Sequence, residues 1–290
     1  MGRRKLLILL GPTAVGKTDL SVSYARRYDS PIISCDSRQI YREMSIGTAV
    51  PSAELRAEIP HYFIQDHTIF EPYTAGKYEV EALALLESLF EQGHETLVMV
   101  GGSGFYIDAL CEGLDDFPPA DLPLREELMR RLKEEGVESL RMELKALDPA
   151  SYASIDIANG QRVVRALEVC LMTGRPFSSF KTGARKERSF EIEKIGLTRP
   201  RAELYARIDA RVLQMVEDGL MEEVRSLYPH RALTALQTVG YKELFPVLEG
   251  EYDLTRGIEL VQRNTRHYAK RQLSWWARDK SIRWQEASTD

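Results

Sequence analysis

LLILLGPTAVGKTDL, residues 6–20, is the stretch that decides the fold of this 290-residue chain. Residues 6–10 form a short apolar run typical of a buried strand, and a helical pattern begins near Asp19. Between them, GPTAVGKT matches the phosphate-loop pattern G-x-x-x-x-G-K-[ST]. Such glycines let successive backbone N–H groups point at one phosphate, and the helix start adds its positive dipole end. We therefore predict phosphate or diphosphate binding by Gly11, Pro12, Thr13, Ala14, Val15, Gly16, Lys17 and Thr18.

Within this loop, two side chains carry the chemistry. Lys17 supplies a mobile cation, and Thr18 offers a hydroxyl to Mg²⁺. The pattern leaves open whether the ligand is a nucleoside triphosphate or another diphosphate. The alternative is a strand-to-helix turn that binds no ligand, in which case the presence of both Lys17 and Thr18 would be a coincidence.

Strand and helix patterns alternate over the first half of the chain. Further strands are expected at 31–36 and 96–102, with helices at 19–28 and 75–92. This alternation is typical of a parallel α/β sheet flanked by helices. A strand at 190–197 and helices near 201–218, 220–227, 241–248 and 254–278 complete the pattern.

A helical segment interrupts this α/β pattern. The Pro-rich acidic connector LDDFPPADLP, residues 114–123, precedes helical stretches at 124–147 and 161–172 with no strand between them. We predict a P-loop NTPase-like α/β core domain, residues 1–118 and 186–290, with a parallel sheet flanked by helices, and a helical insertion domain at 119–185.

Composition places the chain among ordinary globular proteins. It is 43% hydrophobic and 29% charged, and no apolar run approaches the ~20 residues of a membrane helix. Cys35, Cys111 and Cys170 are odd in number and lack CxxC spacing, so neither a disulfide framework nor a cysteine zinc site is indicated. We expect a cytoplasmic protein that does not engage a membrane.

Charge is distributed unevenly along the chain. The net charge of −5 argues against indiscriminate nucleic-acid binding. Residues 161–188 nevertheless carry seven basic and two acidic side chains, which suits a polyanionic partner. A solvated helix face is the alternative explanation of this cluster.

A single acid follows the second predicted strand. PIISCDSRQIY, residues 31–41, places Asp36 at the carboxyl edge of the sheet, where open α/β sheets bind ligands. Asp36 could serve as a general base or a magnesium ligand, and a turn-capping role is the alternative. Ser37, Arg38 and Gln39 follow it, and Gln is a good bidentate partner for adenine.

The third strand ends in a glycine turn without an acid. LVMVGGSGFY, residues 97–106, brings Ser103 and Tyr106 to the same edge, although glycine turns after strands are common. The missing carboxylate weakens the case for a generic P-loop ATPase. Arg162 and Arg165 could form a phosphate clamp on one helix face.

Motifs spread over nearly the whole chain resemble the bacterial tRNA dimethylallyltransferases, also called tRNA isopentenyltransferases. The motifs are GPTAVGKT, ISCDSRQIY, IGTAVP (46–51), PHYFIQD (60–66), VGGSGFY, QRVVRALEV (161–169), TVGYKE (238–243) and TRHYAKRQLSWW (265–276). The resemblance implies transfer of a dimethylallyl group from dimethylallyl diphosphate to N6 of adenosine 37, in tRNAs that read codons starting with U. It also implies that the insertion closes around the anticodon stem-loop.

The resemblance further implies roles for individual residues. Asp36 would act as the base, with Lys17, Thr18 and Ser103 completing the catalytic set; Ser103 stands where the family usually has Thr. Arg211 is chosen over Arg207 as the diphosphate-binding arginine. Contacts to tRNA are implied for Asp36, Ser37, Arg38, Gln39, Ser103, Arg125, Gln161, Arg162, Val163, Val164, Arg165, Gln237, Thr238, Val239, Gly240, Tyr241 and Lys242.

The cofactor expected on this basis is Mg²⁺ on Thr18, and the expected partners are tRNA and dimethylallyl diphosphate, bound by a monomer. Two other functions remain open from the residues alone. One is a P-loop nucleotide or small-molecule kinase with Asp36 as its base. The other is a non-catalytic RNA-binding module that retains the loop.

Overall fold

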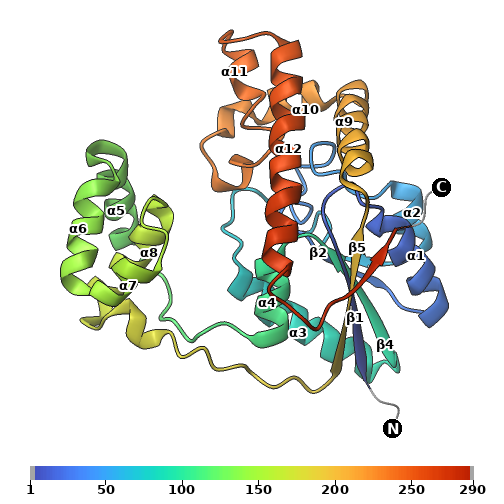
Figure 1. The fold of residues 1–290 in the computed structure, drawn as a ribbon, viewed down its shortest axis with the longest axis horizontal. Helices are drawn as coiled ribbons and strands as arrows, with labels where there is room; N and C mark the ends of the chain where they lie inside the picture. Colours follow the sequence, from blue (N-terminus) through green and yellow to red (C-terminus); the bar gives the residue numbers. More distant parts are fainter. Residues whose placement is uncertain (1–3, 288–290) are drawn as a thin grey trace. The chain divides into compact units, whose positions relative to one another are not determined.

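The computed structural model describes residues 4–287, and the chain divides into two compact units (Figure 1). The first unit comprises Met1–Glu112 and Glu187–Asp290, and the second is Gly113–Lys186. The insertion expected at 119–185 lies inside the second unit. Each unit has its own hydrophobic core.

The first unit is built on a parallel sheet. Among the described residues, six strands pair in the order β3-β2-β4-β1-β5-β6, all in parallel. The predicted α/β fold is confirmed, but the short edge strands β3 and β6 are not indicated by the sequence pattern. The strands are β1 (Lys5–Leu10), β2 (Ile32–Cys35), β3 (His61–Tyr62), β4 (Thr96–Gly101), β5 (Glu191–Thr198) and β6 (Arg283–Glu286).

Helices cover both faces of this sheet, and Figure 1 shows α1 and α12 on opposite sides of it. The helix predicted near 241–248 is wrong over its first half, because only its last turn is helical. None of the helices in the described part of the chain is long and apolar enough to cross a membrane. The helices are α1 (Lys17–Tyr28), α2 (Ala53–Glu58), α3 (Ala75–Glu91), α4 (Gly104–Glu112), α9 (Arg201–Glu217), α10 (Leu220–Leu227), α11 (Phe245–Leu248) and α12 (Leu254–Trp276).

The apolar run of β1 reflects burial on both faces of the sheet. Leu6, Ile8 and Leu10 belong to the largest hydrophobic core, which also contains residues of α3, α4 and α12. Leu7 and Leu9 point to the other face and pack near α1. Side chains alternate across a strand, so a strand covered on both sides reads as a continuous apolar run.

All the regular secondary structure of the second unit is helical. The stretch 124–147, predicted to be helical, is helical except at Gly136, which has a φ of 81° and separates α5 from α6. A small core formed by α5, α6 and α8 holds the unit together. Its helices are α5 (Leu122–Glu135), α6 (Val137–Leu147), α7 (Pro149–Ser154) and α8 (Gly160–Thr173), followed by the 3₁₀ turn Phe177–Phe180.

Candidate active site

The loop between β1 and α1 has the conformation of an anion cradle. Gly11 and Gly16 have φ angles of 151° and 105°, which L side chains rarely adopt. At Gly11, a Cβ would also lie 2.9 Å from the carbonyl oxygen of Leu197. The two glycines turn the chain so that α1 begins at Lys17. The N–H groups of the loop and of the first helical turn can therefore converge on one anion.

Lys17 is the half-buried cation of this loop. Its ammonium group donates to the carbonyl oxygens of Gly11 (2.8 Å) and Pro12 (2.9 Å). Burial, together with the nearby charge of Arg211, lowers the pKa of Lys17 to about 7, and Asp36 acts in the opposite direction. An anion held in the loop would favour the protonated lysine, because an opposite charge at short range stabilises the charged form.

Two arginines hold the backbone of the loop. Arg207, on α9, donates from Nε to the carbonyl oxygen of Ala14 (3.0 Å). Arg199, just before α9, donates from Nε to the carbonyl oxygen of Val15 (2.9 Å). These bonds fix the loop backbone, so its shape depends on the segment that follows β5.

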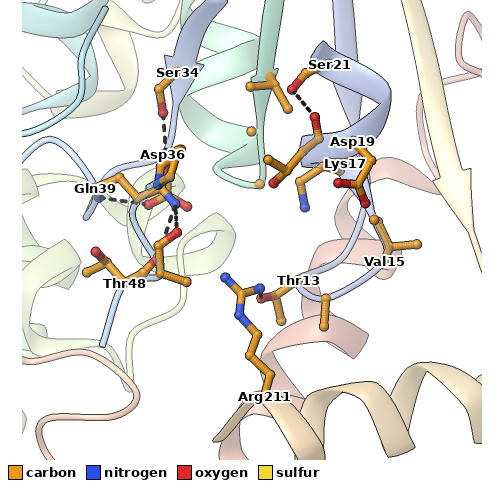
Figure 2. A pocket seen from close by; sticks show the side chains of 18 of the residues that line it. Thr13, Val15, Lys17, Asp19, Ser21, Ser34, Asp36, Gln39, Thr48 and Arg211 are labelled. Atoms are coloured by element: carbon orange, nitrogen blue, oxygen red, sulfur yellow. Dashed lines mark hydrogen bonds between the residues drawn. The ribbon is translucent and has the colours of Figure 1, made fainter. Parts of the chain in front are cut away.

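Arg211 lines both cavities of the site, whereas Arg207 lines only the larger one. Its Nη1 donates to the Thr13 hydroxyl over a long 3.5 Å, and Figure 2 shows its guanidinium between the loop and Asp36. Burial lowers the pKa of Arg211, and Arg207 contributes in the same direction, whereas Asp36 raises it. A cation at this place can reach both an anion in the loop and the acid opposite.

Asp36 follows β2 and is held by a backbone turn. Its Oδ1 accepts hydrogen bonds from the N–H groups of Arg38 (2.8 Å) and Gln39 (3.3 Å). The next N–H group, that of Ser37, donates to the hydroxyl of Ser103 in the β4–α4 turn (2.9 Å). Both bonds to the carboxylate end on Oδ1, so Oδ2 is the oxygen that can accept a proton from a substrate.

Gln39 has a structural task in this turn. Its amide nitrogen donates to the carbonyl oxygens of Thr48 (3.1 Å) and Ala49 (3.0 Å), and its amide oxygen accepts from the hydroxyl of Ser34 (3.4 Å). A bidentate contact with adenine, which the residue type favours, would require these bonds to break. Gln39 therefore shapes the wall of the cavity in this structure.

Two cavities meet at the acid. The larger has a volume of about 450 Å³ and lies over the phosphate loop. The smaller, of about 120 Å³, has an apolar wall formed mainly by α9, α10 and α12. Residues lining both cavities are Thr13, Ala14, Asp36, Thr48, Arg211 and Tyr268. The structure thus brings the predicted anion ligands and the predicted base to one site (Figure 2).

Helix α12 contributes residues that sequence reasoning missed. Thr265, Tyr268 and Gln272 line the cavities, and their spacing of three and four places them on one helix face. Burial raises the pKa of Tyr268, and the charge of Asp36 adds to this effect. The available signal was this row of polar side chains on the inward face of an amphipathic helix.

Only some residues of the segment 237–242 line the site. Residues 238–240 line the smaller cavity. The side chains of Gln237 and Lys242 are exposed. Tyr241 is buried, and its hydroxyl donates to Glu223 Oε1 (2.7 Å), so it supports the fold beneath the cavity.

In the second unit, α8 carries the predicted segment 161–165. Gln161 and Arg162 are exposed at the start of the helix. Val163 and Val164 are buried in the core of the unit and so are not presented to a ligand. The helix periodicity thus divides the segment into a buried side and a surface side.

Arg125 and Arg165 share one buried acid in this unit. Arg125 donates from Nε (3.1 Å) and Nη2 (2.6 Å) to Glu168 Oε2, and Arg165 donates to it from Nη1 (2.9 Å). The N–H of Asp121 donates to Oε1 (2.9 Å). The two arginine side chains remain 36% and 29% exposed. Two cations on one carboxylate leave a surplus positive charge at the surface.

A family model described as IPP transferase matches residues 39–279 of the chain. The chain belongs to the IPP transferase family. Across 98% of its length it is 49% identical to tRNA dimethylallyltransferase 1 of Bacteroides fragilis, covering 94% of that protein. It is 52% identical to tRNA dimethylallyltransferase 1 of Porphyromonas gingivalis, with 98% and 95% of the two chains covered. The resemblance predicted from the motifs is confirmed, and the kinase alternative finds no support.

Solved structures of IPP transferase relatives have the same fold. The tRNA isopentenylpyrophosphate transferase of Bacillus halodurans is 37% identical and superposes with a TM-score of 0.71, with 98% of this chain and 90% of that chain covered. A eukaryotic dimethylallyltransferase acting on tRNA is 25% identical with a TM-score of 0.81, and 74% of its chain is covered.

We predict that inorganic diphosphate binds with uptake of a proton above pH 7. Lys17 has its pKa lowered to about 7, and a bound anion raises it again, so affinity falls by up to about tenfold per pH unit as the pH rises above 7. Titration calorimetry in two buffers of different ionisation enthalpy measures the uptake. Lys17→Met should abolish this component, whereas Lys133→Met, at an exposed position, should not. Equal uptake by wild type and Lys17→Met would contradict the prediction.

Proposed function

We propose that the protein transfers a dimethylallyl group from dimethylallyl diphosphate to N6 of adenosine 37 in tRNAs that read codons starting with U. The product is N6-dimethylallyladenosine, and diphosphate is released. One observation carries the proposal: the phosphate loop and Arg211 face Asp36 across one cavity. A leaving-group site and a proton acceptor thus flank the space where an allylic carbon and an amine can meet.

The phosphate loop would hold the diphosphate of the donor. Its backbone N–H groups, Lys17 and Arg211 place positive charge where the leaving group gains negative charge. Fixed donors of this kind stabilise a transition state because they need no reorganisation during the reaction. Cleavage of an allylic C–O bond then depends on how well this charge is balanced.

Asp36 would take the proton of the attacking amine. The C1–O bond of the donor breaks and its electron pair leaves with the diphosphate, while the N6 lone pair forms the new bond to C1. N6 then gives one proton to Asp36 Oδ2. The turn that binds Oδ1 keeps the carboxylate in place for this transfer.

Mg²⁺ suits the oxygen donors of this site. Thr18 offers a hydroxyl at the wall of the larger cavity, in the first turn of α1. Across residues 4–287, no three His, Cys, Asp or Glu side chains gather as a metal site. Mg²⁺ commonly takes one or two protein oxygens and completes its shell with substrate phosphates and water. Thr18 would hold it, and the ion would neutralise charge on the diphosphate.

Adenosine 37 would have to leave the base stack to reach Asp36, since enzymes that act on a base extrude it. The smaller cavity, with residues 238–240 and Arg38 in its wall, borders Asp36 and is the part of the site that we assign to RNA. Ser37 and Ser103 fix this edge through their mutual hydrogen bond. Gln237 and Lys242, both exposed, would contact the RNA outside the cavity.

The second unit would bind the anticodon stem-loop through its arginines. Arg162 is exposed, and Arg125 with Arg165 leaves a surplus charge beside Glu168. Arginine pairs phosphate oxygens well because its guanidinium donates two parallel hydrogen bonds. Gln161 adds a neutral donor at the same helix start.

We place the protein in the cytoplasm and expect it to act as a monomer. Cys35, Cys111 and Cys170 are free and buried, which suits a reducing compartment.

A transfer assay tests the proposed function. We predict that radiolabel passes from dimethylallyl diphosphate to an unmodified anticodon stem-loop carrying A36-A37-A38 in the presence of Mg²⁺. The label should be lost when A37 is replaced. ATP consumption is followed in parallel, and ATP turnover without labelled RNA would refute the proposal.

In the same assay, Asp36→Asn should lower the transfer rate by about 10²- to 10⁴-fold, because the amide cannot accept the N6 proton. Stem-loop affinity, measured by fluorescence anisotropy, should change by less than about threefold, since the turn around residue 36 can persist with an amide oxygen. Asp29→Asn is the matched control, because this residue caps α1 in a left-handed conformation that Asn tolerates. A rate within about threefold of wild type in Asp36→Asn would remove the base role.

Arg162→Ala should weaken stem-loop binding and reduce the slope of log affinity against log salt by about 1, because one phosphate contact is lost. The KM for dimethylallyl diphosphate should not change. Arg130→Ala provides the control, since Arg130 is exposed on α5 but paired with Glu127 and Glu134. An unchanged salt slope in Arg162→Ala would exclude a phosphate contact at this residue.

A further inference from the structure

Gln272 is a polar side chain buried in the interior of the first unit. It lies on α12 with 6% of its surface exposed, among residues that line the larger cavity. A buried amide requires hydrogen-bond partners, because its desolvation is otherwise uncompensated. Its partners identify what this residue does.

Both ends of the Gln272 amide are bonded, to two different loops. The N–H of Thr13, in the phosphate loop, donates to Oε1 (2.9 Å), and Nε2 donates to the carbonyl oxygen of Gly102, in the β4–α4 turn (2.9 Å). A Cβ at residue 102 would lie 2.4 Å from Nε2, so the turn approaches the amide as closely as it does only because residue 102 is glycine. The amide therefore joins the two loops directly.

The contact continues from the β4–α4 turn to the acid. Gly102 is followed by Ser103, whose hydroxyl accepts from the N–H of Ser37, the residue after Asp36. At the other end of Gln272, Thr13 belongs to the phosphate loop, which carries Lys17. The hydroxyl of Thr13 accepts a hydrogen bond from Arg211. One chain of hydrogen bonds thus runs from the phosphate loop through Gln272 to the turn that holds Asp36.

We propose that Gln272 is a positioning residue that sets the separation between the phosphate loop and the Asp36 carboxylate. The inference rests on the proposed function, in which these two groups bind the leaving diphosphate and the amine proton. Gln272 acts through Thr13 and Gly102. Because the Thr13 N–H donates to Gln272, this part of the loop is tied to α12.

Gln272→Met should lower kcat about 10- to 100-fold, because small displacements of reacting groups cost rates of this order. Methionine has a similar length and fills the space, but it makes neither of the two hydrogen bonds. The KM values for dimethylallyl diphosphate and for the stem-loop should stay within about threefold, since each loop keeps its own ligand-binding groups. Steady-state kinetics with each substrate varied in turn separates the two parameters.

Gln272→Glu provides a pH readout that a purely space-filling role would not give. The ionised carboxylate still accepts from Thr13 but repels the Gly102 carbonyl oxygen, whereas the protonated acid can donate to that oxygen. Burial raises the pKa of a carboxyl group at this place. The rate of Gln272→Glu relative to wild type at the same pH should therefore rise by about tenfold or more between pH 8 and pH 6.

Gln262→Met is the matched control. Gln262 lies on the same helix, and its Nε2 donates to the carbonyl oxygen of Asp209 (3.2 Å), away from the phosphate loop. Its kcat should equal that of wild type, while thermal unfolding reports any loss of stability in each variant. Where Gln272→Met does not fold, the pH profile of Gln272→Glu decides.

The outcomes separate this inference from the proposed function. A wild-type protein that transfers no dimethylallyl group contradicts the proposed function itself. A wild type that does transfer, with a folded Gln272→Met of unchanged kcat or a Gln272→Glu whose relative rate is flat with pH, overturns the positioning role. A change confined to KM also overturns it, because the residue would then support binding alone.

Discussion

Two half-buried positive charges at a phosphate loop are the constraint on which this structure depends. Lys17 and Arg211 lie in one cavity, and burial lowers the pKa of both. Such an arrangement is unfavourable without an opposing charge, and Asp36 is the acid whose charge counteracts both shifts. The same acid is placed to accept a proton. Electrostatic support of the cations and the proposed base chemistry therefore demand the same residue at the same place.

The order of the strands in the sheet determines how the cations and Asp36 are placed relative to one another. β4 lies between β1, which carries the phosphate loop, and β2, which carries Asp36. The phosphate loop and Asp36 therefore lie on strands that are not neighbours, and the strand between them contributes to holding them in register. The β4–α4 turn meets this need, and at Gly101 a Cβ would lie 2.0 Å from the carbonyl oxygen of Cys35. The Gly101–Gly102 pair thus permits close approach both to β2 and to the Gln272 amide of α12.

Local sequence patterns predicted the fold and the centre of the site, whereas contacts between residues far apart in the sequence could not be predicted. The apolar run 6–10 and the loop GPTAVGKT depend on neighbours in sequence, so β1, α1 and the anion cradle follow from them. The edge strand β6 and the role of Gln272 depend on pairing partners far along the chain, which periodicity does not contain. The break at Gly136 was readable in principle, because glycine with positive φ commonly ends a helix. The motif that includes Val163 indicated a segment for RNA contact, but it did not indicate which of its side chains face the solvent. The packing of α8 shows that the Val163 side chain is buried.

Separate cores allow the two units to meet different physical requirements. The first unit must keep its site rigid, because closely spaced cations, an acid and a shared amide tolerate little movement. The second unit packs around its own core and places Glu168, fully buried, beneath Arg125 and Arg165 at the surface. That carboxylate orients two guanidiniums that would otherwise be mobile, so the proposed binding of a phosphate would cost less entropy. Recognition of a polyanion and chemistry on a single base can therefore be tuned by different residues. In the proposed reaction, surface arginines of the second unit serve recognition, and hydrogen bonds inside the first unit position the reacting groups.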